Sequence, residues 1–268
     1  MKKYIYCFKL HFLNAINYRF NTVVELLFGN LRLLIVIFFW NLVYGGDAYK
    51  TLNGFTLPGI VTYLVVIDIF GALIFRLRNS GFDYADMIKR GSLGPAILKP
   101  HNLGITIYFR NLAGGVTGMI PQAALIMCAL PFVARFFTWE ADAVSVLSIP
   151  LFLFAGTITA HLLCSLLGYM AFWLEESNAV MWSFVVLLNM LTGFFLPLDF
   201  FPGWSIYILE VLPVASWGYI PAKACIGLYS YGKLAYLLIV QIAWIGILLR
   251  LNASVWRRGA AKYSSVGG

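Results

Sequence analysis

Long apolar segments separated by short polar ones limit the folds open to this chain more than any other feature. A helix crosses the hydrocarbon of a bilayer with about 20 apolar residues, and six segments approach or exceed that length. They are residues 22–44, 55–75, 105–133, 145–174, 179–198 and 234–256. Only 11% of the residues are charged, whereas soluble proteins average about 25%. The sequence therefore predicts an all-α integral membrane protein with six transmembrane helices in a single domain, residues 1–268.

The first 21 residues differ from these spans because they mix basic and apolar side chains. Lys2, Lys3 and Lys9 are interleaved with tyrosine, isoleucine, phenylalanine and leucine. A helix of this composition lies in the membrane interface, with its apolar face among the acyl chains and its cations among the headgroups. We therefore expect residues 1–21 to form an amphipathic interfacial helix.

The distribution of Lys and Arg predicts how the chain is oriented. Most of these cations fall in the N-terminal segment, in the loop between the second and third spans, and in the C-terminal tail. Because basic residues accumulate on the cytoplasmic side of a membrane, we expect both termini in the cytoplasm and the spans in the plasma membrane. This rule also accounts for the net charge of +8, so the expected partner is the lipid bilayer and not nucleic acid.

The one long cytoplasmic segment, residues 76–104, has a pattern suited to contact with a partner. Charged residues come first and an apolar stripe follows. The stripe consists of Ile88, Leu93, Ile97 and Leu98, and Pro100 comes soon after it. A short helix lying across the membrane face would present such a stripe to a cytoplasmic protein. A solvated connector fits the pattern equally well.

The segment after the fifth span stays apolar where an aqueous loop would turn polar. It begins within GFFLPLDFFPGW, from Gly193 to Trp204, and residues 199–232 continue it. Prolines at positions 197, 202, 213 and 221 prevent one continuous helix. The pattern predicts short re-entrant helices in the outer leaflet, with their broken backbone buried in protein. An aromatic-rich loop resting on the bilayer, with Trp204 at the interface, is the alternative.

Two charges lie deep inside the predicted spans. Arg32 is in the first span and Asp68 in the second, and at about 1.5 Å of rise per residue their depths are similar. An unpaired charge in hydrocarbon costs several kcal/mol, so we predict an ion pair between Arg32 and Asp68. A structural role for this pair is favoured over a role in substrate binding. His161, inside the fourth span, fits a hydrogen-bonded packing residue better than a ligand or a proton carrier.

The sequence carries no readable motif for catalysis or for binding a cofactor. GLYSYGKL, from Gly227 to Leu234, matches a phosphate-binding loop as far as its lysine, but Leu234 replaces the Ser or Thr that holds magnesium. There is no zinc-protease motif, no nucleophile elbow and no metal-binding cysteine spacing. We therefore expect no enzymatic activity and no cofactor on this chain.

Several motifs, in their order along a six-span chain, resemble the type-2 permease subunits of ABC exporters. YRFNTVVELL resembles the entry to their first span, and GSLGPAILKP, Gly91–Pro100, resembles their cytoplasmic motif. The glycine and prolines of the outer segment, and the final span that ends in RRGAAKYSSVGG, are also similar. The terminal Gly267–Gly268 is typical of the branch with a Gly-Gly tail. Gly94 departs from the pattern, because family members often carry an acid there.

The resemblance implies a division of labour between subunits. Such permeases hold no nucleotide. Two of them, identical or paralogous, form the translocation path, and two separate ATPase subunits bind ATP and Mg. The residues implied in coupling to the ATPase are Gly91, Ile97, Leu98, Lys99 and Pro100. Those implied in the re-entrant outer motif are Gly193, Pro197, Pro202, Trp204 and Pro213.

The sequence leaves three functions open. The leading one is an ABC exporter permease for an amphipathic or lipid-like substrate, with small residues at 111–118 and 153–160 allowing close helix contacts, between two subunits or within one. The alternative is a proton-coupled secondary transporter that uses Asp68 and His161 as carriers. The third is a membrane scaffold or immunity protein without transport. An ATPase partner would favour the first function, and dependence on a proton gradient the second.

Overall fold

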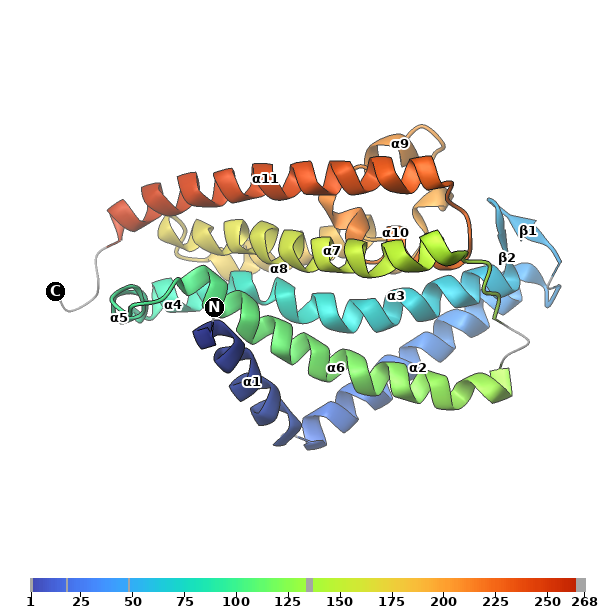
Figure 1. The fold of residues 1–268 in the computed structure, drawn as a ribbon, viewed down its shortest axis with the longest axis horizontal. Coiled ribbons are helices and arrows are strands. Elements are labelled where there is room, and N and C mark those ends of the chain that lie inside the picture. The colour runs from blue at the N-terminus through green and yellow to red at the C-terminus, as the bar shows by residue number, and fades with distance from the viewer. Residues whose placement is uncertain (1, 18, 48, 134–136, 264–268) are drawn as a thin grey trace.

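The computed structural model describes residues 2–17, 19–47, 49–133 and 137–263, and these residues are largely helical (Figure 1). The longer helices are α1 (Lys2–Asn17), α2 (Arg19–Tyr44), α3 (Leu57–Arg78), α4 (Ser80–Lys89), α6 (Leu103–Val133), α7 (Ala143–Tyr169), α8 (Ser177–Leu191) and α11 (Tyr231–Lys262). The short ones are α5 (Leu93–Ile97), η2 (Met170–Phe172), η3 (Leu198–Phe200), α9 (Ile206–Leu209), η4 (Pro213–Trp217) and α10 (Tyr219–Cys225). Two strands, β1 (Thr51–Leu52) and β2 (Phe55–Thr56), form an antiparallel hairpin.

Four stretches of the described chain are long and apolar enough to cross a membrane. They are Leu57–Lys89, Leu103–Cys128, Ala143–Phe172 and Tyr231–Lys262. The other two predicted spans correspond to shorter apolar helices, Asn30–Tyr44 within α2 and Ser177–Leu191, which is α8. The prediction of an all-α membrane protein is confirmed, and four of its six predicted spans meet the length and composition of a full crossing.

Helix α8 is shorter than the span predicted at residues 179–198. Its 15 residues extend about 22 Å, which is less than the hydrocarbon thickness of about 30 Å. The helix ends at Leu191 because Gly193 adopts a φ of +75°, a conformation that residues with a Cβ rarely adopt. Tyr63 of α3 donates a hydrogen bond of 2.8 Å to the Gly193 carbonyl. The chain therefore changes direction at Gly193 and enters the helix bundle.

Helix α3 is the central helix of the bundle. In Figure 1 it runs between α7 and the pair α6 and α2, and it contacts all three as well as α10. Its side chains are apolar around much of the circumference, and Ile60, Tyr63 and Ile67 are almost fully buried. A helix that is apolar on all sides is stable only in a core or in a membrane, so α3 forms the core against which the other helices pack.

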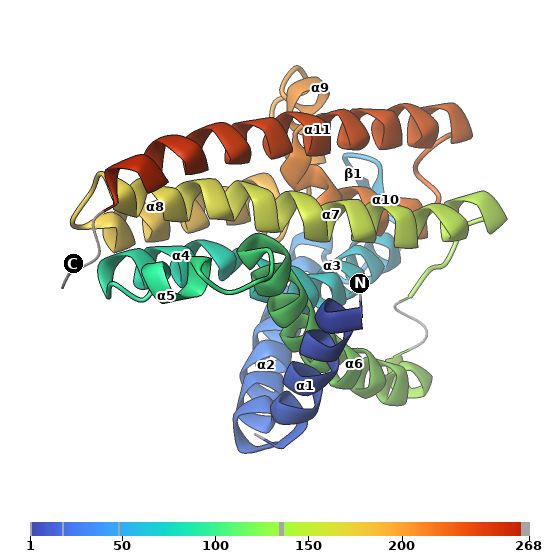
Figure 2. The ribbon, with the colours of Figure 1, turned by 60° about the vertical axis from the view of Figure 1, so that its left-hand side comes forward.

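Helix α4 continues α3 after a one-residue break and packs against α7 and α8 (Figure 2). The backbones of α4 and α7 are in contact at Gly81 and Gly168, which is the close approach that small residues permit between helices. Arg76 and Arg78, which begin the predicted cytoplasmic segment 76–104, lie on the last turn of α3. These two arginines are therefore held on a helix inside the packed part of the molecule.

Residues 199–232, which the sequence predicts to lie in the outer leaflet and which we call the outer segment, fold into short helices, and two of these are buried. η4 and α10 pack against α3 and α7, and all residues from Pro213 to Ile226 are buried. Pro197 precedes η3 and Pro213 opens η4, which are positions where the missing N–H and the fixed φ of proline are tolerated. Trp204 and Tyr207, by contrast, are 70% and 74% exposed. The segment thus combines a buried part with an aromatic surface turn.

Local sequence explains where two further elements begin and end. Asn53 and Gly54 both have positive φ, as a two-residue hairpin turn with an Asn-Gly sequence requires. Asp142 caps the N-terminus of α7 by accepting a hydrogen bond of 3.0 Å from the Ser145 backbone N–H. Hydrogen bonds from Ser145 and Tyr231 hold the pKa of the Asp142 carboxyl below its ordinary value.

Candidate functional site

A polar cluster joins three helices in the middle of the bundle. Arg32 of α2 forms an ion pair with Asp68 of α3, so the structure brings together the two residues expected to pair. Gln122 of α6 donates a hydrogen bond of 2.6 Å to the second carboxylate oxygen of Asp68, and Asn30 donates one of 3.1 Å to Gln122. Sequence reasoning missed these two amides, although polar side chains inside apolar helices were a usable signal.

The surroundings of the ion pair explain why it is tolerated. Asp68 is only 8% exposed, and a buried charge is stable where a counter-charge and hydrogen bonds satisfy it. The Arg32 guanidinium lies 4.1 Å from the centre of the Phe194 ring, in a cation–π contact. The cluster therefore ties α2 to α3, to α6 and to the chain that leaves α8. Its contacts favour a structural role for the pair.

A cavity of about 520 Å³ lies beside this cluster. Its polar lining consists of Arg32, Asp68, Arg76, Arg78, Gln122, Asn189 and Thr192. Its apolar lining includes Ile67, Ile74, Phe75, Phe194, Phe195 and Trp217. Sequence reasoning missed this grouping because its members come from α2, α3, α6, α8 and the segments that follow α8. The volume is within the usual range of ligand pockets, about 300–1,000 Å³.

Replacing Asp68 with asparagine is expected to lower the free energy of unfolding by about 2–3 kcal/mol, because Arg32 keeps its charge without a carboxylate. The loss is smaller than for a fully buried pair because the Arg32 side chain is 37% exposed. The exchanged pair Arg32→Asp with Asp68→Arg should recover part of the loss. Unfolding in mixed micelles measures all three proteins. A single variant as stable as the unchanged protein would contradict the importance of the pair.

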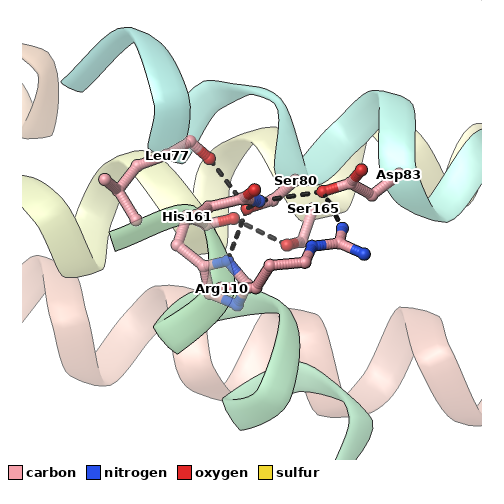
Figure 3. A network of polar contacts seen from close by, with 7 residues as sticks. Leu77, Ser80, Asp83, Arg110, His161 and Ser165 are labelled. Carbon is pink, nitrogen blue, oxygen red and sulfur yellow. Dashed lines mark hydrogen bonds and ion pairs between the residues drawn. The ribbon is translucent and has the colours of Figure 1, made fainter. Parts of the chain in front are cut away.

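A second polar network lies where α4, α6 and α7 meet (Figure 3). Ser80 Oγ donates a hydrogen bond of 2.8 Å to the Leu77 carbonyl. The same oxygen lies 2.7 Å from His161 Nδ1 and accepts a bond of 3.1 Å from Asn111. The Ser80 hydroxyl has one proton and donates it to the Leu77 carbonyl. Its contact with His161 is therefore a hydrogen bond when His161 carries a proton on Nδ1 and donates it to Ser80 Oγ. This environment favours the interpretation of His161 as a packing residue.

An ion pair extends this network, and Figure 3 shows Arg110 directed at the carboxylate of Asp83. Asp83 Oδ2 lies 2.5 Å from the Arg110 guanidinium and accepts a hydrogen bond of 2.8 Å from Asn111. The network thereby joins α6 to α4. Among the described contacts, Asp68 and His161 share no partner. The two groups of the proton-coupled alternative thus belong to separate networks.

The end of the molecule beyond α4 exposes the residues expected to couple to an ATPase. Gly91 reverses the chain with a φ of +73°. Ile97 and Leu98 are 46% and 87% exposed, and Lys99 and Pro100 are exposed beside them. We call residues 97–100 the cytoplasmic tip, after the side of the membrane that the sequence predicts for them. The tip therefore presents two adjacent exposed apolar side chains next to a lysine.

Helix α1 is attached to the cytoplasmic tip. Lys3 Nζ donates a hydrogen bond of 2.7 Å to the Pro100 carbonyl, and the Tyr4 hydroxyl accepts one of 3.0 Å from the Asn102 backbone N–H. Tyr4 also stacks on Phe109 of α6, with ring centres 6.1 Å apart. The expected interfacial helix at residues 1–21 corresponds to α1 and the start of α2, and residues 1 and 18 lie outside the described chain. A displacement of the tip would therefore act on α1.

The outer segment contains buried charges that sequence reasoning missed. Lys223 Nζ of α10 lies 2.8 Å from Asp199 Oδ1, and the Tyr219 hydroxyl donates a hydrogen bond of 2.8 Å to Asp199 Oδ2. Glu210, 4% exposed, lies 2.5 Å from Lys233 at the start of α11. The partners are separated by at least twenty residues in sequence, so no local sequence pattern predicts these contacts. They fix the short helices to one another and to α11.

The residues of the outer motif lie at the turns of this segment. Gly193 ends the α8 region, and Pro197 and Pro202 lie on either side of η3. Trp204 is exposed in the turn before α9, whereas Pro213 is buried at the start of η4. The glycine therefore lies at a turn, the prolines lie at the ends of short helices, and Trp204 lies on the surface.

The cysteines give no sign of a metal site. Cys164 and Cys225 are buried, and all four cysteines are free of disulfide bonds. In the described part of the chain, no group of three or more His, Cys, Asp or Glu side chains is arranged to hold a metal ion. Cys164 and Cys225 are therefore best understood as packing residues.

Comparisons with known proteins identify the family of the chain. No curated protein and no solved structure matches it. The family model described as ABC-2 family transporter protein matches residues 31–267, which include the Arg32–Asp68 pair, the cytoplasmic tip and the outer segment. Gly267 and Gly268, on which the resemblance to the Gly-Gly branch rests, lie outside the described residues. The chain therefore belongs to the ABC-2 transporter family and is a membrane permease of an ABC transporter.

Proposed function

We propose that this permease is the membrane subunit of an ATP-driven exporter of amphipathic or lipid-like molecules. It forms the translocation path with a second permease, identical or paralogous, in the plasma membrane. Separate ATPase subunits bind ATP and Mg and dock from the cytoplasm, where both termini lie. The family match over residues 31–267 supports the permease assignment, and the cytoplasmic tip carries the proposal of a partner.

The cytoplasmic tip combines a firm base with an exposed surface. Leu93, four residues before Ile97, is fully buried, and α5 contacts α4, which in turn packs on α7 and α8. Leu98 is more exposed than Ile97 beside it. The tip is anchored through α4 to the bundle and through Lys3 to α1. A partner that bound Leu98 would therefore act on α4 and α1 together. Small movements at such an interface drive the rigid-body closures of domains.

The proposed topology has six crossings. α2, α3 with α4, α6, α7 and α11 each cross once, and α8 completes its crossing with the outer segment. η4 and α10 are the re-entrant helices, and their burial against α3 and α7 supports this, because irregular backbone at membrane depth must be enclosed by protein. In this arrangement the β1–β2 hairpin and α9 face outward, and α5 faces the cytoplasm.

Changing Ile97, Leu98 and Lys99 to serine is expected to abolish copurification of an ATPase with the permease. The serine side chains remove the apolar contact and the charge without touching the buried Leu93. The measurement is the amount of ATP-hydrolysing partner per permease, after purification in mild detergent from the native host. The matched control changes Trp204, Tyr207 and Ile208, exposed on the proposed outer face, to serine and should retain the ATPase.

Two results would argue against this proposal. An ATPase that remains bound to the variant of the cytoplasmic tip would place the coupling surface elsewhere. If no ATPase copurifies in several detergents and transport follows a proton gradient, the proton-coupled alternative would be favoured, and Asp68 would be the next residue to change.

A further inference from the structure

We propose that the cavity beside the Arg32–Asp68 pair binds the anionic group of an amphipathic substrate. The inference rests on the proposed function, because it takes the bound molecule to be the cargo of the permease. The cavity has a volume of about 520 Å³ and is lined by both polar and apolar side chains. Their arrangement indicates the chemistry of the ligand.

The positive charge of Arg78 has no acidic partner in the described part of the chain. Its Nη1 bonds to the neutral side chain of Asn189, and its guanidinium lies 5.3 Å from the Phe75 ring centre. Its Nε is buried without a hydrogen-bond partner. Among the described lining residues the one carboxylate is Asp68, which Arg32 already engages. An anionic oxygen near Arg78 would balance the charge and satisfy the buried donor.

Arg78 lies at a position where an unpaired positive charge is costly. It lies on the last turn of α3, and α4 continues beyond it along α7 and α8. A cation held on a packed helix is costly unless a counter-charge reaches it. Guanidinium groups bind phosphate and carboxylate oxygens through paired N–H donors. The cavity thus selects for an anion, and a phosphate or a carboxylate has the required geometry.

The rest of the lining is suited to an alkyl chain. Phe75 and Phe195 are 50% and 54% exposed, so apolar rings stand at the open side of the cavity. Trp217 and Phe194 line it further. A free inorganic anion would gain nothing from these rings, whereas an amphiphile buries its chain against them and its anionic group against Arg78.

The test uses the full-length permease in nanodiscs of phosphatidylcholine, with dodecyl phosphate as the probe. Dodecyl phosphate is expected to bind saturably. Dodecyltrimethylammonium, which has the same chain and opposite charge, and inorganic phosphate should both bind at least about tenfold more weakly. Equal affinity for the anionic and the cationic amphiphile would overturn the proposal.

Two variants test the site itself. Arg78→Gln should weaken the binding of dodecyl phosphate at least about tenfold. The matched control is Arg90→Gln, because Arg90 is exposed and pairs with Asp86 on the surface of α4, and it should bind normally. Unchanged binding by Arg78→Gln would overturn the proposal.

Asn189→Asp keeps the inference testable should Arg78→Gln fail to fold. It supplies Arg78 with a carboxylate from α8, so it should raise the melting temperature while abolishing binding of dodecyl phosphate. Arg78→Lys, which keeps the charge, should retain part of the binding. Binding by Asn189→Asp at the affinity of the unchanged protein would count against the site.

A competition experiment distinguishes the two sources of such an anion. If phosphatidylglycerol added to the nanodiscs displaces dodecyl phosphate, the site takes a membrane lipid. If it does not, the site takes a smaller amphiphile, and either result supports an anion site. The binding measurements need no ATPase. If no ATPase copurifies with the permease and dodecyl phosphate still binds through Arg78, the exporter function is contradicted and the anion site stands.

Discussion

Replacing Lys223 with methionine is expected to lower the free energy of unfolding by about 3–5 kcal/mol, the usual cost of breaking a buried ion pair. Lys223 is 8% exposed, and its Nζ lies 2.8 Å from Asp199 and 3.0 Å from the Tyr219 hydroxyl. The variant leaves the Asp199 carboxylate, whose side chain is 18% exposed, with Tyr219 as its remaining donor among the described contacts. Since α10 packs directly on α3 and α7, the loss falls on the core of the bundle.

Two companions make this result interpretable. Asp199→Leu together with Lys223→Met removes both charges and should regain most of the stability, because an apolar pair pays no desolvation cost. Asp86→Asn breaks the exposed pair with Arg90, whose side chains are 54% and 76% exposed, and should cost less than about 1 kcal/mol. Unfolding in mixed micelles of dodecyl maltoside and dodecyl sulfate measures each variant. If Lys223→Met were as stable as Asp86→Asn, the buried pair would not hold the outer segment.

The long helices were predictable because hydrophobic length determines them. The span expected at 105–133 corresponds to α6, and the last, expected at 234–256, lies inside α11. The contact between Arg32 and Asp68 was also accessible from the sequence, because two opposite charges at similar depth in neighbouring spans have few other ways to be satisfied. The helix prediction and the ion-pair prediction both depend only on the apolar solvent that the bilayer provides. That solvent affects every residue of a span in the same way.

The features that could not be predicted from the sequence depend on tertiary contacts. Arg76 and Arg78 follow an apolar run and precede turn residues, so they looked like loop residues. The contact between Gly81 and Gly168 instead holds α4 against α7 and keeps both arginines on a packed helix. The cavity beside the Arg32–Asp68 pair could not be predicted for the same reason, because Asn189 contacts Arg78 across more than a hundred residues of sequence.

The small-residue segments show how a local pattern can leave two interpretations open. A Cβ on Gly115 would lie 2.7 Å from the Leu73 carbonyl oxygen, and one on Gly156 would lie 2.8 Å from the Ser216 carbonyl oxygen. Both glycines therefore serve close packing within one subunit. The sequence predicted close approach at these positions, but it could not say which chain provides the neighbour.

Enlarging Gly168 is expected to have the other large effect, because it separates α4 from α7. A Cβ at this position would overlap the Gly81 carbonyl oxygen and lie 2.8 Å from the Gly81 Cα. Both are backbone atoms, so no side chain can move aside to relieve the overlap. Gly168→Ala should cost about 1–3 kcal/mol through overpacking, and Gly168→Val should cost more because its branched side chain forces the helices further apart.

Gly246 of α11 provides the matched control for Gly168, because a Cβ there meets no atom within 4 Å. Gly246→Ala should be neutral or slightly stabilising, since alanine favours a helix over glycine by about 1 kcal/mol. The difference in unfolding free energy between the two alanine variants therefore isolates the helix contact. The same displacement should weaken ATPase binding, because the cytoplasmic tip follows α4. A Gly168→Ala protein that matched Gly246→Ala in both stability and ATPase binding would show that α4 does not depend on this contact.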